Sequence, residues 1–355
     1  MGSSGSRFRI SQYIGRRMHA RIRIGGSGRG FRRLLEVSGV LACLVMAAGW
    51  SSPAPAQEQT FTNPLVLHAE EVGEVRSCAD PTVLRWSPPG DDAWYMVCTS
   101  DPLSGADRDE QGSLRYRTLP MFRSEDLVTW DYLGDALEAP PAWAEPGAGL
   151  WAPELHESAG TYFLYFAVTD VRPGVSGEVG CATDGAIGVA TAPSPSGPWV
   201  NHDSPVVRPR RSGPGCDFAS TLDPDVVRDE TGQGFLLFGG YKGGIASRRL
   251  SPDGLFAPAV TEVAVTTGRY EAPEVFRTDR GYVLFASPNG CCNGDLTGYA
   301  VMAARSPSPE GPYTDRHGAD LLDGRTGGTP VLAASGGAFV GPGHISVFGD
   351  RDGTT

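Results

Sequence analysis

Short apolar runs separated by polar turns recur along most of the chain. Four of them, "AWYMVCTS" (93–100), "TYFLYFAVTD" (161–170), "GFLLFGGY" (234–241) and "GYVLFASP" (281–288), are rich in the Val, Tyr, Phe and Leu side chains that fill strands. Each follows a polar turn ("SPPGDD", "ESAG", "DETGQ" or "TDR") and an earlier apolar run. This pattern predicts β-hairpins. The 48 glycines and 29 prolines favour many short strands over long helices.

The first strand of each predicted hairpin carries a repeated motif with a proline near an acid. The copies are "CADPTVLR" (78–85), "LWAPELHE" (150–157), "TLDPDVVRD" (221–229) and "RYEAPEVF" (269–276), with a fifth, proline-free copy in "GHISVFGD" (343–350). Repetition of one strand motif without helical periodicity is typical of a β-propeller, in which each copy begins one blade. Five copies therefore predict five blades.

Further strands echo one another outside these hairpins. "IGVATAPSPSGPWVNHDS" (187–204) matches "VMAARSPSPEGPYTDRHG" (301–318), and "FRSEDLVTWDYLG" (122–134) plays the same part in the first unit. Each unit thus supplies about four strands, and we predict an all-β, five-bladed β-propeller domain over 57–355. An irregular β-sandwich is the alternative, although sandwiches do not usually repeat a motif at such spacing.

The predicted fifth blade is incomplete, because the sequence reaches "GDRDGTT" one strand into that blade. Either the sequence is a fragment, or a strand near 61–68 supplies part of the final sheet. The second option would close the propeller by pairing the two ends of the domain.

Residues 1–56 differ in composition from the rest. They contain nine arginines and one acid, Glu36, followed by the apolar run "VSGVLACLVMAAGW" (37–50) and "SSPAPA", which ends at Ala56. This order is typical of a secretory signal peptide cleaved near Ala56, which implies an extracellular protein. A membrane anchor is the alternative, but a run of 14 residues is short for a membrane span.

Charge and cysteine content agree with that export. Without residues 1–56, the 30 basic and 41 acidic residues fall to 21 and 40, a net charge of −19. Such a surface disfavours nucleic acids and anionic membranes and suits a neutral substrate; we expect a monomer. Six cysteines remain, and disulfides are expected outside the cell. We predict the pairs Cys78–Cys98 and Cys181–Cys216, with the adjacent Cys291 and Cys292 either bridged or free.

The repeated strands also carry the candidate chemistry. In a propeller the innermost strands face one central channel, so Asp80, Asp223 and either Glu271 or Glu274 would converge. Two carboxyl groups suffice to hydrolyse a glycosidic bond, one as acid and one as base, and a third nearby could raise the pKa of the acid. A plain strand-start signal would explain any one of these motifs, but three equivalent acids favour a site.

Strand alternation and chemistry disagree about the glutamate. Asp80 and Asp223 directly precede their prolines, and Glu274 shares their parity relative to Pro273 whereas Glu271 does not. A β-bulge would reset that parity. Glu274 also occupies the same motif position as Glu154 and Asp225, which indicates a recurrent structural acid.

The ordered set of motifs resembles glycoside hydrolase family 43, most closely its secreted arabinan-degrading branch. The set comprises "ADPTVL", "RSEDLVTW", "LWAPELHESAGTYFLYFAV", "LDPDVVRDETGQGFLLFGG", "YEAPEVF", "CCNG", "ARSPSPEGPY" and "GPGHISVFGDRDGT". The resemblance implies a five-bladed propeller and an inverting glycosidase that acts on α-1,5-arabinan or arabinose side chains of plant cell-wall polysaccharides.

The same resemblance assigns residues. It implies Asp80 as general base, Asp223 as the aspartate that tunes the acid, and Glu271 as general acid. His344 would face a central metal ion, usually calcium, although a hydrogen-bonded channel histidine is the alternative. Trp151 would stack on a sugar, or belong to the core.

Three positions depart from the pattern of that branch: Ser220 replaces an asparagine, Gly240 a serine and Ile345 an asparagine. The sugar contacts can therefore differ, so exo action or a β-xylosidase remains open. A non-catalytic carbohydrate-binding propeller is the alternative outside the enzymes. The presence of all three carboxylates argues against it.

Overall fold

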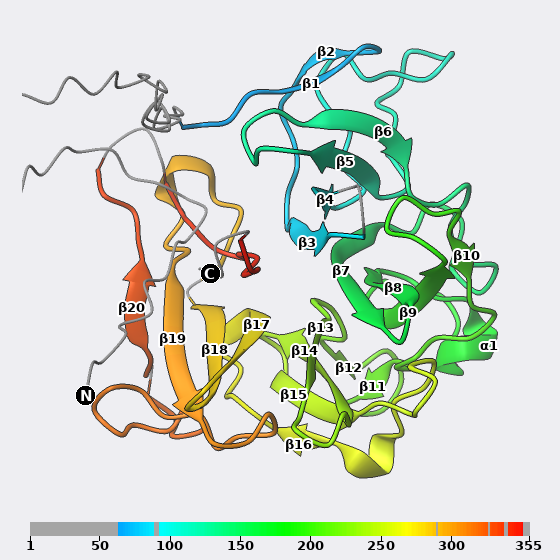
Figure 1. The fold of residues 1–355 in the computed structure, drawn as a ribbon. Helices are drawn as coiled ribbons and strands as arrows, with labels where there is room; N and C mark the ends of the chain where they lie inside the picture. The colour runs from blue at the N-terminus through cyan, green and yellow to red at the C-terminus, as the bar shows by residue number, and fades with distance from the viewer. Residues whose placement is uncertain (1–62, 89–91, 289, 326, 337–339, 351–355) are drawn as a thin grey trace, which may run out of the picture. The chain divides into compact units, whose positions relative to one another are not determined.

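The structure is a computed structural model that describes residues 63–88, 92–288, 290–325, 327–336 and 340–350. From Leu65 onward these residues form one unit, whose sheets are arranged as the blades of a propeller (Figure 1). The predicted signal peptide lies outside the described residues. No helix in the described part is long and apolar enough to cross a membrane.

The first sheet has the strand order β2-β1-β6-β5-β4-β3. Its strands are β1 (Leu67–Ala69), β2 (Gly73–Val75), β3 (Thr82–Trp86), β4 (Ala93–Val97), β5 (Pro120–Ser124) and β6 (Asp131–Asp135). β1 pairs with β2 and β6 in this sheet. Of the two options for the last blade, a strand near 61–68 that completes the final sheet is not found in the described residues, because β1 extends the first sheet outward instead.

Three further sheets have four strands each, antiparallel and in chain order from the inner strand outward. They comprise β7 (Leu150–Ser158), β8 (Thr161–Val168), β9 (Ala186–Ala192) and β10 (Val200–Asn201); β13 (Asp225–Arg228), β14 (Gly234–Gly240), β15 (Gly244–Arg249) and β16 (Val263–Ala264); and β17 (Tyr270–Thr278), β18 (Gly281–Pro288), β19 (Val301–Ser306) and β20 (Thr329–Leu332). The predicted hairpins are the inner pairs β3–β4, β7–β8, β13–β14 and β17–β18. The prediction of an all-β propeller is confirmed.

Smaller elements complete the chain. They are α1 (Pro173–Ser176), the ribbon of β11 (Arg210–Arg211) and β12 (Phe218–Ala219), and the 3₁₀ turns Ala259–Thr261 and Gly294–Leu296. The outer strand of the fourth sheet lies later than the echo at 301–318 predicts. After the Gly-Pro turn, Thr314 forms only isolated bridges with Arg305 and Asp320, and β20 then takes the edge beside β19.

Apolar side chains fill the spaces between neighbouring sheets. Tyr95 of the first sheet packs in one cluster with Phe166 of the second, and Tyr165 of the second packs in another with Phe238 of the third. A third cluster joins Leu237 to the fourth sheet. The core is therefore divided among blade interfaces, and strands hydrophobic on both faces, such as β4, β8, β14 and β18, are buried along almost their whole length.

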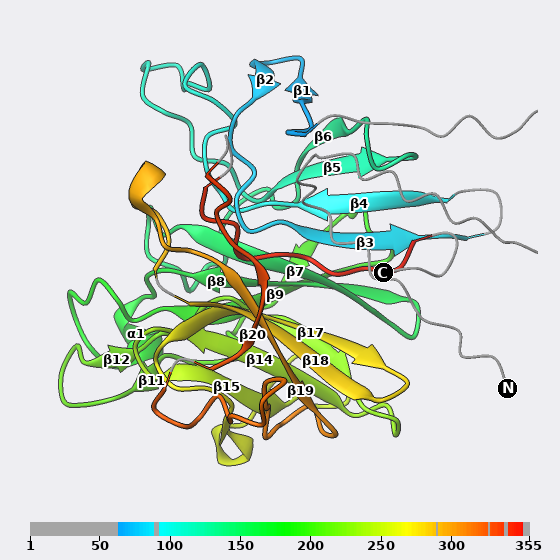
Figure 2. The same ribbon diagram turned by 90° about the vertical axis from the view of Figure 1, so that its left-hand side faces the viewer.

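The fifth motif copy forms no strand, but it lies where an inner strand would. Ile345 and Val347 pack in a cluster with the fourth sheet, and Phe348 packs in a cluster with the first. Val83 of β3 donates its N–H to Ser346 Oγ at 3.0 Å. The segment can be followed beside β3 in Figure 2, where it is red. The described residues thus contain four sheets and a fifth inner segment; five complete blades remain a prediction.

All five motif copies share one unusual backbone conformation. Asp80, Ala152, Asp223, Ala272 and His344 have positive φ values of 48°, 46°, 54°, 52° and 48°. Residues with a Cβ rarely adopt this left-handed region, because Cβ then approaches the following carbonyl oxygen. Its recurrence in every copy shows that the repeat imposes it.

A side chain two residues further on links each copy to the next. In every case an oxygen of that side chain accepts the N–H of the neighbouring inner strand. The acceptor and donor pairs are Thr82 with Leu155 (3.1 Å), Glu154 with Val226, Asp225 with Val275 (3.0 Å), Glu274 with Val347 (2.7 Å) and Ser346 with Val83 (3.0 Å). The last pair returns to β3, so the five links form a closed ring.

Ser346→Ala removes one link and leaves the Val83 N–H without its acceptor. We expect this to lower the free energy of unfolding by about 1 kcal/mol, the usual net contribution of such a hydrogen bond. Chemical denaturation measures it. Ser335→Ala, at an exposed position, is the matched control and should change stability by much less. Equal stability of the two variants would show that the ring contributes nothing.

Disulfides fix three loops. The structure pairs Cys78 with Cys98, Cys181 with Cys216, and the adjacent Cys291 with Cys292. The first two predictions are confirmed, and of the two options for the vicinal pair the bridged one is found. Cys78–Cys98 joins the segment before β3 to the end of β4, next to Asp80.

Candidate active site

Asp80 begins the inner strand of the first sheet and is held from two sides. Thr99 donates its hydroxyl to Asp80 Oδ2 at 2.8 Å, and His344 Nδ1 lies 3.1 Å from Asp80 Oδ1. Thr99 Oγ1 also accepts the N–H of Ala152 at 2.9 Å. The carboxylate is thereby fixed by the first sheet, the second sheet and the C-terminal segment together.

Asp223 occupies the equivalent position in the third sheet. Its side chain is buried, and Oδ2 accepts the N–H of Ala272 at 2.9 Å. Ala272 directly follows Glu271 in β17. The bond therefore sets the backbone that presents Glu271, and it places two carboxylates from neighbouring strands at the same end of the channel.

Glu271 meets two tyrosines. The hydroxyl groups of Tyr299 and Tyr241 both hydrogen-bond its carboxyl group. Tyr241 is held in turn by the N–H of Gly290, 2.9 Å from its hydroxyl oxygen. A Cβ at Gly343 would lie 2.1 Å from the Tyr299 ring, so that position of the "GPGH" segment requires glycine.

Ser287 joins this group to the C-terminal segment. It hydrogen-bonds Tyr299 through its side chain, and its Oγ accepts the N–H of His344 at 3.0 Å. Glu271 and Ser287 are direct partners across β17 and β18. Ser287 therefore helps to fix both His344 and Tyr299, the tyrosine that hydrogen-bonds Glu271.

The environment moves the carboxyl pKa values in opposite directions. Burial opposes ionisation of Asp80, but the charge and hydrogen bond of His344 outweigh it and hold the Asp80 pKa below its usual range. Burial raises the pKa of Asp223 to about 7, helped by the charges of Asp80 and Glu271. Burial also raises the pKa of Glu271, against the Tyr299 and Tyr241 hydrogen bonds, which lower it.

His344 titrates with these acids. Burial alone would lower its pKa, but the charges of Asp80 and Asp223 raise it to about 9. The histidine therefore carries a positive charge at neutral pH in this environment. His344 makes the hydrogen bond expected of a channel histidine, and a metal ion facing it stays a prediction.

A β-bulge decides between Glu271 and Glu274. The register between β17 and β18 shifts between these two residues, at the left-handed Ala272. The alternation of side chains between the two faces of the sheet is interrupted there. Glu271 therefore contacts Tyr299 and Tyr241, whereas Glu274 accepts the N–H of Val347 in the ring of links. The expectation from simple alternation, which selected Glu274, is wrong because the strand is not regular at this point.

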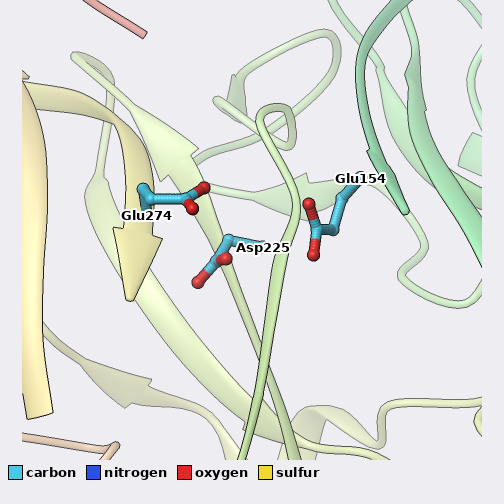
Figure 3. A group of neighbouring side chains, drawn as sticks. All are labelled: Glu154, Asp225 and Glu274. Atoms are coloured by element: carbon cyan, nitrogen blue, oxygen red, sulfur yellow. The ribbon is translucent and has the colours of Figure 1, made fainter. Parts of the chain in front are cut away.

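Glu154, Asp225 and Glu274 form a second carboxylate group (Figure 3). One oxygen atom from each lies within 4.8 Å of the other two. Burial, and repulsion from the neighbouring carboxyl groups, raises the pKa of Glu154 and of Glu274 well above the usual value, and burial raises the pKa of Asp225. The recurrent acids of the repeat therefore come together. Asp225 and Glu274 lie two and three residues further along the chain than Asp223 and Glu271.

Trp151 holds the same repeat position as Glu271. Its side chain is 46% exposed, which contradicts the alternative of core packing. The indole lies over Gly149, where a Cβ would come within 2.5 Å of Nε1. An exposed, supported ring at the start of β7 is suited to stack on a sugar.

Sequence reasoning missed the residues that hold the acids. They lie outside the repeated motif: Thr99 and Tyr241 follow β4 and β14, Ser287 lies near the end of β18, and Tyr299 lies just before β19. One signal could have indicated three of them: Thr99, Tyr241 and Ser287 lie at or just beyond the end of a strand that pairs with a motif strand. Tyr299, before β19, has no such signal.

The fold and the site define a class. A propeller channel gathers an aspartate with a lowered pKa and a glutamate with a raised pKa, the two protonation states that an acid and a base need to cleave one glycosidic bond. The arrangement is that of a glycosidase.

Comparison with known proteins names the family. The profile of glycosyl hydrolases family 43 matches residues 75–355. An extracellular exo-α-(1→5)-L-arabinofuranosidase of Cellvibrio japonicus is 28% identical, covering 76% of this chain and 74% of its own length. An extracellular endo-α-(1→5)-L-arabinanase of Bacillus subtilis is 27% identical over 83% of this chain and 84% of its own.

Solved structures agree with the sequence comparison. The α-L-arabinanase of Cellvibrio cellulosa complexed with arabinohexaose superposes with a TM-score of 0.61 at 25% identity, covering 78% of this chain and 84% of its own. The native arabinanase of Bacillus subtilis gives 0.59 at 26% identity, over 76% and 85%. The chain belongs to glycosyl hydrolases family 43.

Tyr299→Phe removes a hydrogen bond that lowers the pKa of Glu271. The Glu271 pKa should therefore rise, and the alkaline limb of the kcat/KM profile should move to higher pH. The profile on a chromogenic glycoside measures this shift. Tyr282→Phe, a tyrosine of the same sheet outside the site, is the control and should leave the limb in place. An unmoved limb in Tyr299→Phe would exclude the hydrogen bond as a determinant.

Proposed function

We propose that this protein is a secreted, inverting hydrolase of α-L-arabinofuranosidic bonds, with α-1,5-arabinan as its substrate. The observation that carries the proposal is the group of Asp80, Asp223 and Glu271 with opposed pKa shifts. The arabinan-cleaving relatives and the arabinohexaose complex supply the sugar. The names of the extracellular relatives support secretion. A signal peptide cleaved near Ala56 is the part of the proposal that rests on the sequence alone.

Asp80 acts as general base. Its lowered pKa keeps the carboxylate ionised at neutral pH, and His344 and Thr99 fix its orientation. It takes a proton from a water molecule as that water attacks the anomeric carbon from the face opposite the departing sugar. One displacement by water inverts the configuration.

Glu271 acts as general acid. Its raised pKa keeps the proton on the carboxyl group until the glycosidic oxygen leaves. The hydroxyls of Tyr299 and Tyr241 then stabilise the carboxylate that remains. Asp223 tunes this acid by its charge and by its bond to the N–H of Ala272, which orients the Glu271 backbone.

Trp151 and the net negative charge of the protein both suit a neutral sugar substrate. The exposed indole stacks on a sugar ring beside the acids. The net charge of −19 after removal of residues 1–56 suits an uncharged polysaccharide. An exo-acting relative is as similar to this chain as an endo-acting one, so exo action is the second candidate.

We further propose that calcium occupies the channel. The family points to His344, whereas the oxygen donors that calcium prefers are those of Glu154, Asp225 and Glu274, which lie within 4.8 Å of one another. These carboxylates would hold the ion, with His344 near them. When bound, calcium supplies positive charge that favours ionisation of the three acids.

Asp80→Ala and Glu271→Gln should each reduce arabinan hydrolysis by about 10²–10⁴-fold, the usual contribution of a general base or acid. Reducing-sugar release measures the rate, and circular dichroism confirms the fold. Glu138→Gln, at an exposed position outside the site, is the control and should retain its activity. Activity close to that of the unmodified protein in Asp80→Ala or Glu271→Gln would refute the assignment.

The product profile from linear arabinan separates endo from exo action. Mixed oligosaccharides early in the reaction mean endo cleavage, and arabinose alone means exo cleavage. A parallel panel of aryl arabinosides and aryl xylosides tests the sugar. Turnover of xylosides without arabinosides would replace the proposal by a β-xylosidase.

Calcium removal should destabilise the protein most at higher pH. Without the ion, the raised pKa values of Glu154, Asp225 and Glu274 give stability that is present below the usual carboxyl range and is lost as pH rises toward the folded-state values. Calcium should therefore raise Tm more at pH 8 than at pH 5, as measured by calorimetry with and without a chelator. Asp225→Asn should lose this response; a response equal to that of the unmodified protein would place calcium elsewhere.

A further inference from the structure

A second pocket lies at the opposite end of the inner strands from the acids. It has a volume of about 370 Å³, within the usual range of ligand pockets. Its lining residues are Leu84, Arg85, Trp86, Ser87, Pro88, Glu157 and Tyr162. Asp80 starts the segment that ends at Trp86, so at roughly 3.3 Å per residue the two ends are about 20 Å apart.

Trp86 departs from the repeat to which it belongs. Six residues beyond the left-handed position, the other four copies have small or polar residues: Ser158, Asp229, Thr278 and Asp350. The blade geometry therefore does not require an aromatic residue there. The Trp86 indole packs in part against the apolar cluster between the first and second sheets and also lines the pocket.

Two aromatic side chains of the pocket are held rigidly. Trp86 packs edge-on against Tyr95, with ring centroids 5.9 Å apart and an interplanar angle of 73°. It also hydrogen-bonds the side chain of Tyr162, which is buried at the start of β8. Rings fixed before binding lose little conformational freedom when a ligand arrives.

The polar groups of the pocket carry no net positive charge. Arg85 donates to both carboxylate oxygens of Asp92, at 2.8 and 3.0 Å, and to the carbonyl of Asp350 at 3.2 Å. Glu157 adds a carboxylate at the exposed edge, and Ser87 adds a hydroxyl. Aromatic rings combined with hydrogen-bonding groups and a slightly negative charge suit a neutral polyhydroxylated ligand and disfavour an anionic one.

We propose that this pocket is a second carbohydrate site, which binds a stretch of neutral polysaccharide outside the catalytic channel. The sugar rings stack on the indole of Trp86, and their hydroxyls bond Glu157, Ser87 and Arg85. The identity of the polysaccharide, arabinan, rests on the proposed function. The site increases binding of polymers without touching the reacting bond, so short substrates do not depend on it.

The test measures binding and turnover separately. Affinity electrophoresis in gels with soluble linear arabinan is run in a Glu271→Gln background, where the polymer stays intact. Trp86→Ser, which inserts the residue of the second copy, should weaken retardation about tenfold, the range expected for one aromatic contact. In the otherwise unmodified protein, turnover of an aryl arabinofuranoside should not change. Phe256→Ala, which removes an exposed ring of the third sheet region, is the matched control.

A second variant tests the site in the event that Trp86→Ser does not fold. Ser87→Trp fills the pocket from an exposed position and should reduce retardation to the same extent. Retardation unchanged in Ser87→Trp overturns the proposal, as does retardation by polygalacturonate that equals retardation by arabinan. Gels with xylan and galactan separate a failure of this site from a failure of the proposed function. If xylan or galactan retards the protein in a Trp86-dependent way and arabinan is not hydrolysed, the second site stands and only arabinan is rejected as its ligand.

Discussion

The left-handed residue at the start of each inner strand is the constraint on which this site depends. A regular strand would send residues of equal parity to one face of the sheet. The turn at Ala272 breaks that rule and lets Glu271 and Glu274, three residues apart, serve two different groups of carboxylates. At Asp80, Asp223 and His344 the strained residue itself carries the side chain that enters the channel. Strained backbone of this kind persists only where its surroundings determine it fully.

The surroundings here are the links between neighbouring inner strands. Two residues beyond each left-handed position, a side-chain oxygen fixes the next strand, and the five links close on themselves through Ser346 and Val83. The same repeat therefore supplies both the strain and the contacts that hold it. The residues with proposed functional roles, Asp80, Trp151 and Glu271, lie at the left-handed position or directly before it, where the copies differ. The linking position, two residues beyond the left-handed one, is polar in every copy.

Much of this could be predicted from the sequence, because the motif repeats and its spacing carries the topology. The hairpins, the propeller class, two of the three disulfides and the convergence of Asp80 with Asp223 followed from pattern alone. The choice of Glu271 needed the family resemblance, since the bulge at Ala272 is a property of the backbone that alternation does not show. Tyr299 could not be found, because a loop brings it to Glu271 and no repeat marks it. The place of β1 was also beyond prediction, because an edge strand can pair with either end of the domain.

The order in which the chain is made gives the C-terminal segment a further meaning. His344 and Ser346 belong to the last of the five motif copies to leave the ribosome, yet they hold Asp80 and Val83, which belong to the first. Until that copy is in place, Asp80 lacks the imidazole that offsets the effect of burial on its pKa. The surroundings of the proposed general base are therefore complete only when the first and the last motif copies meet.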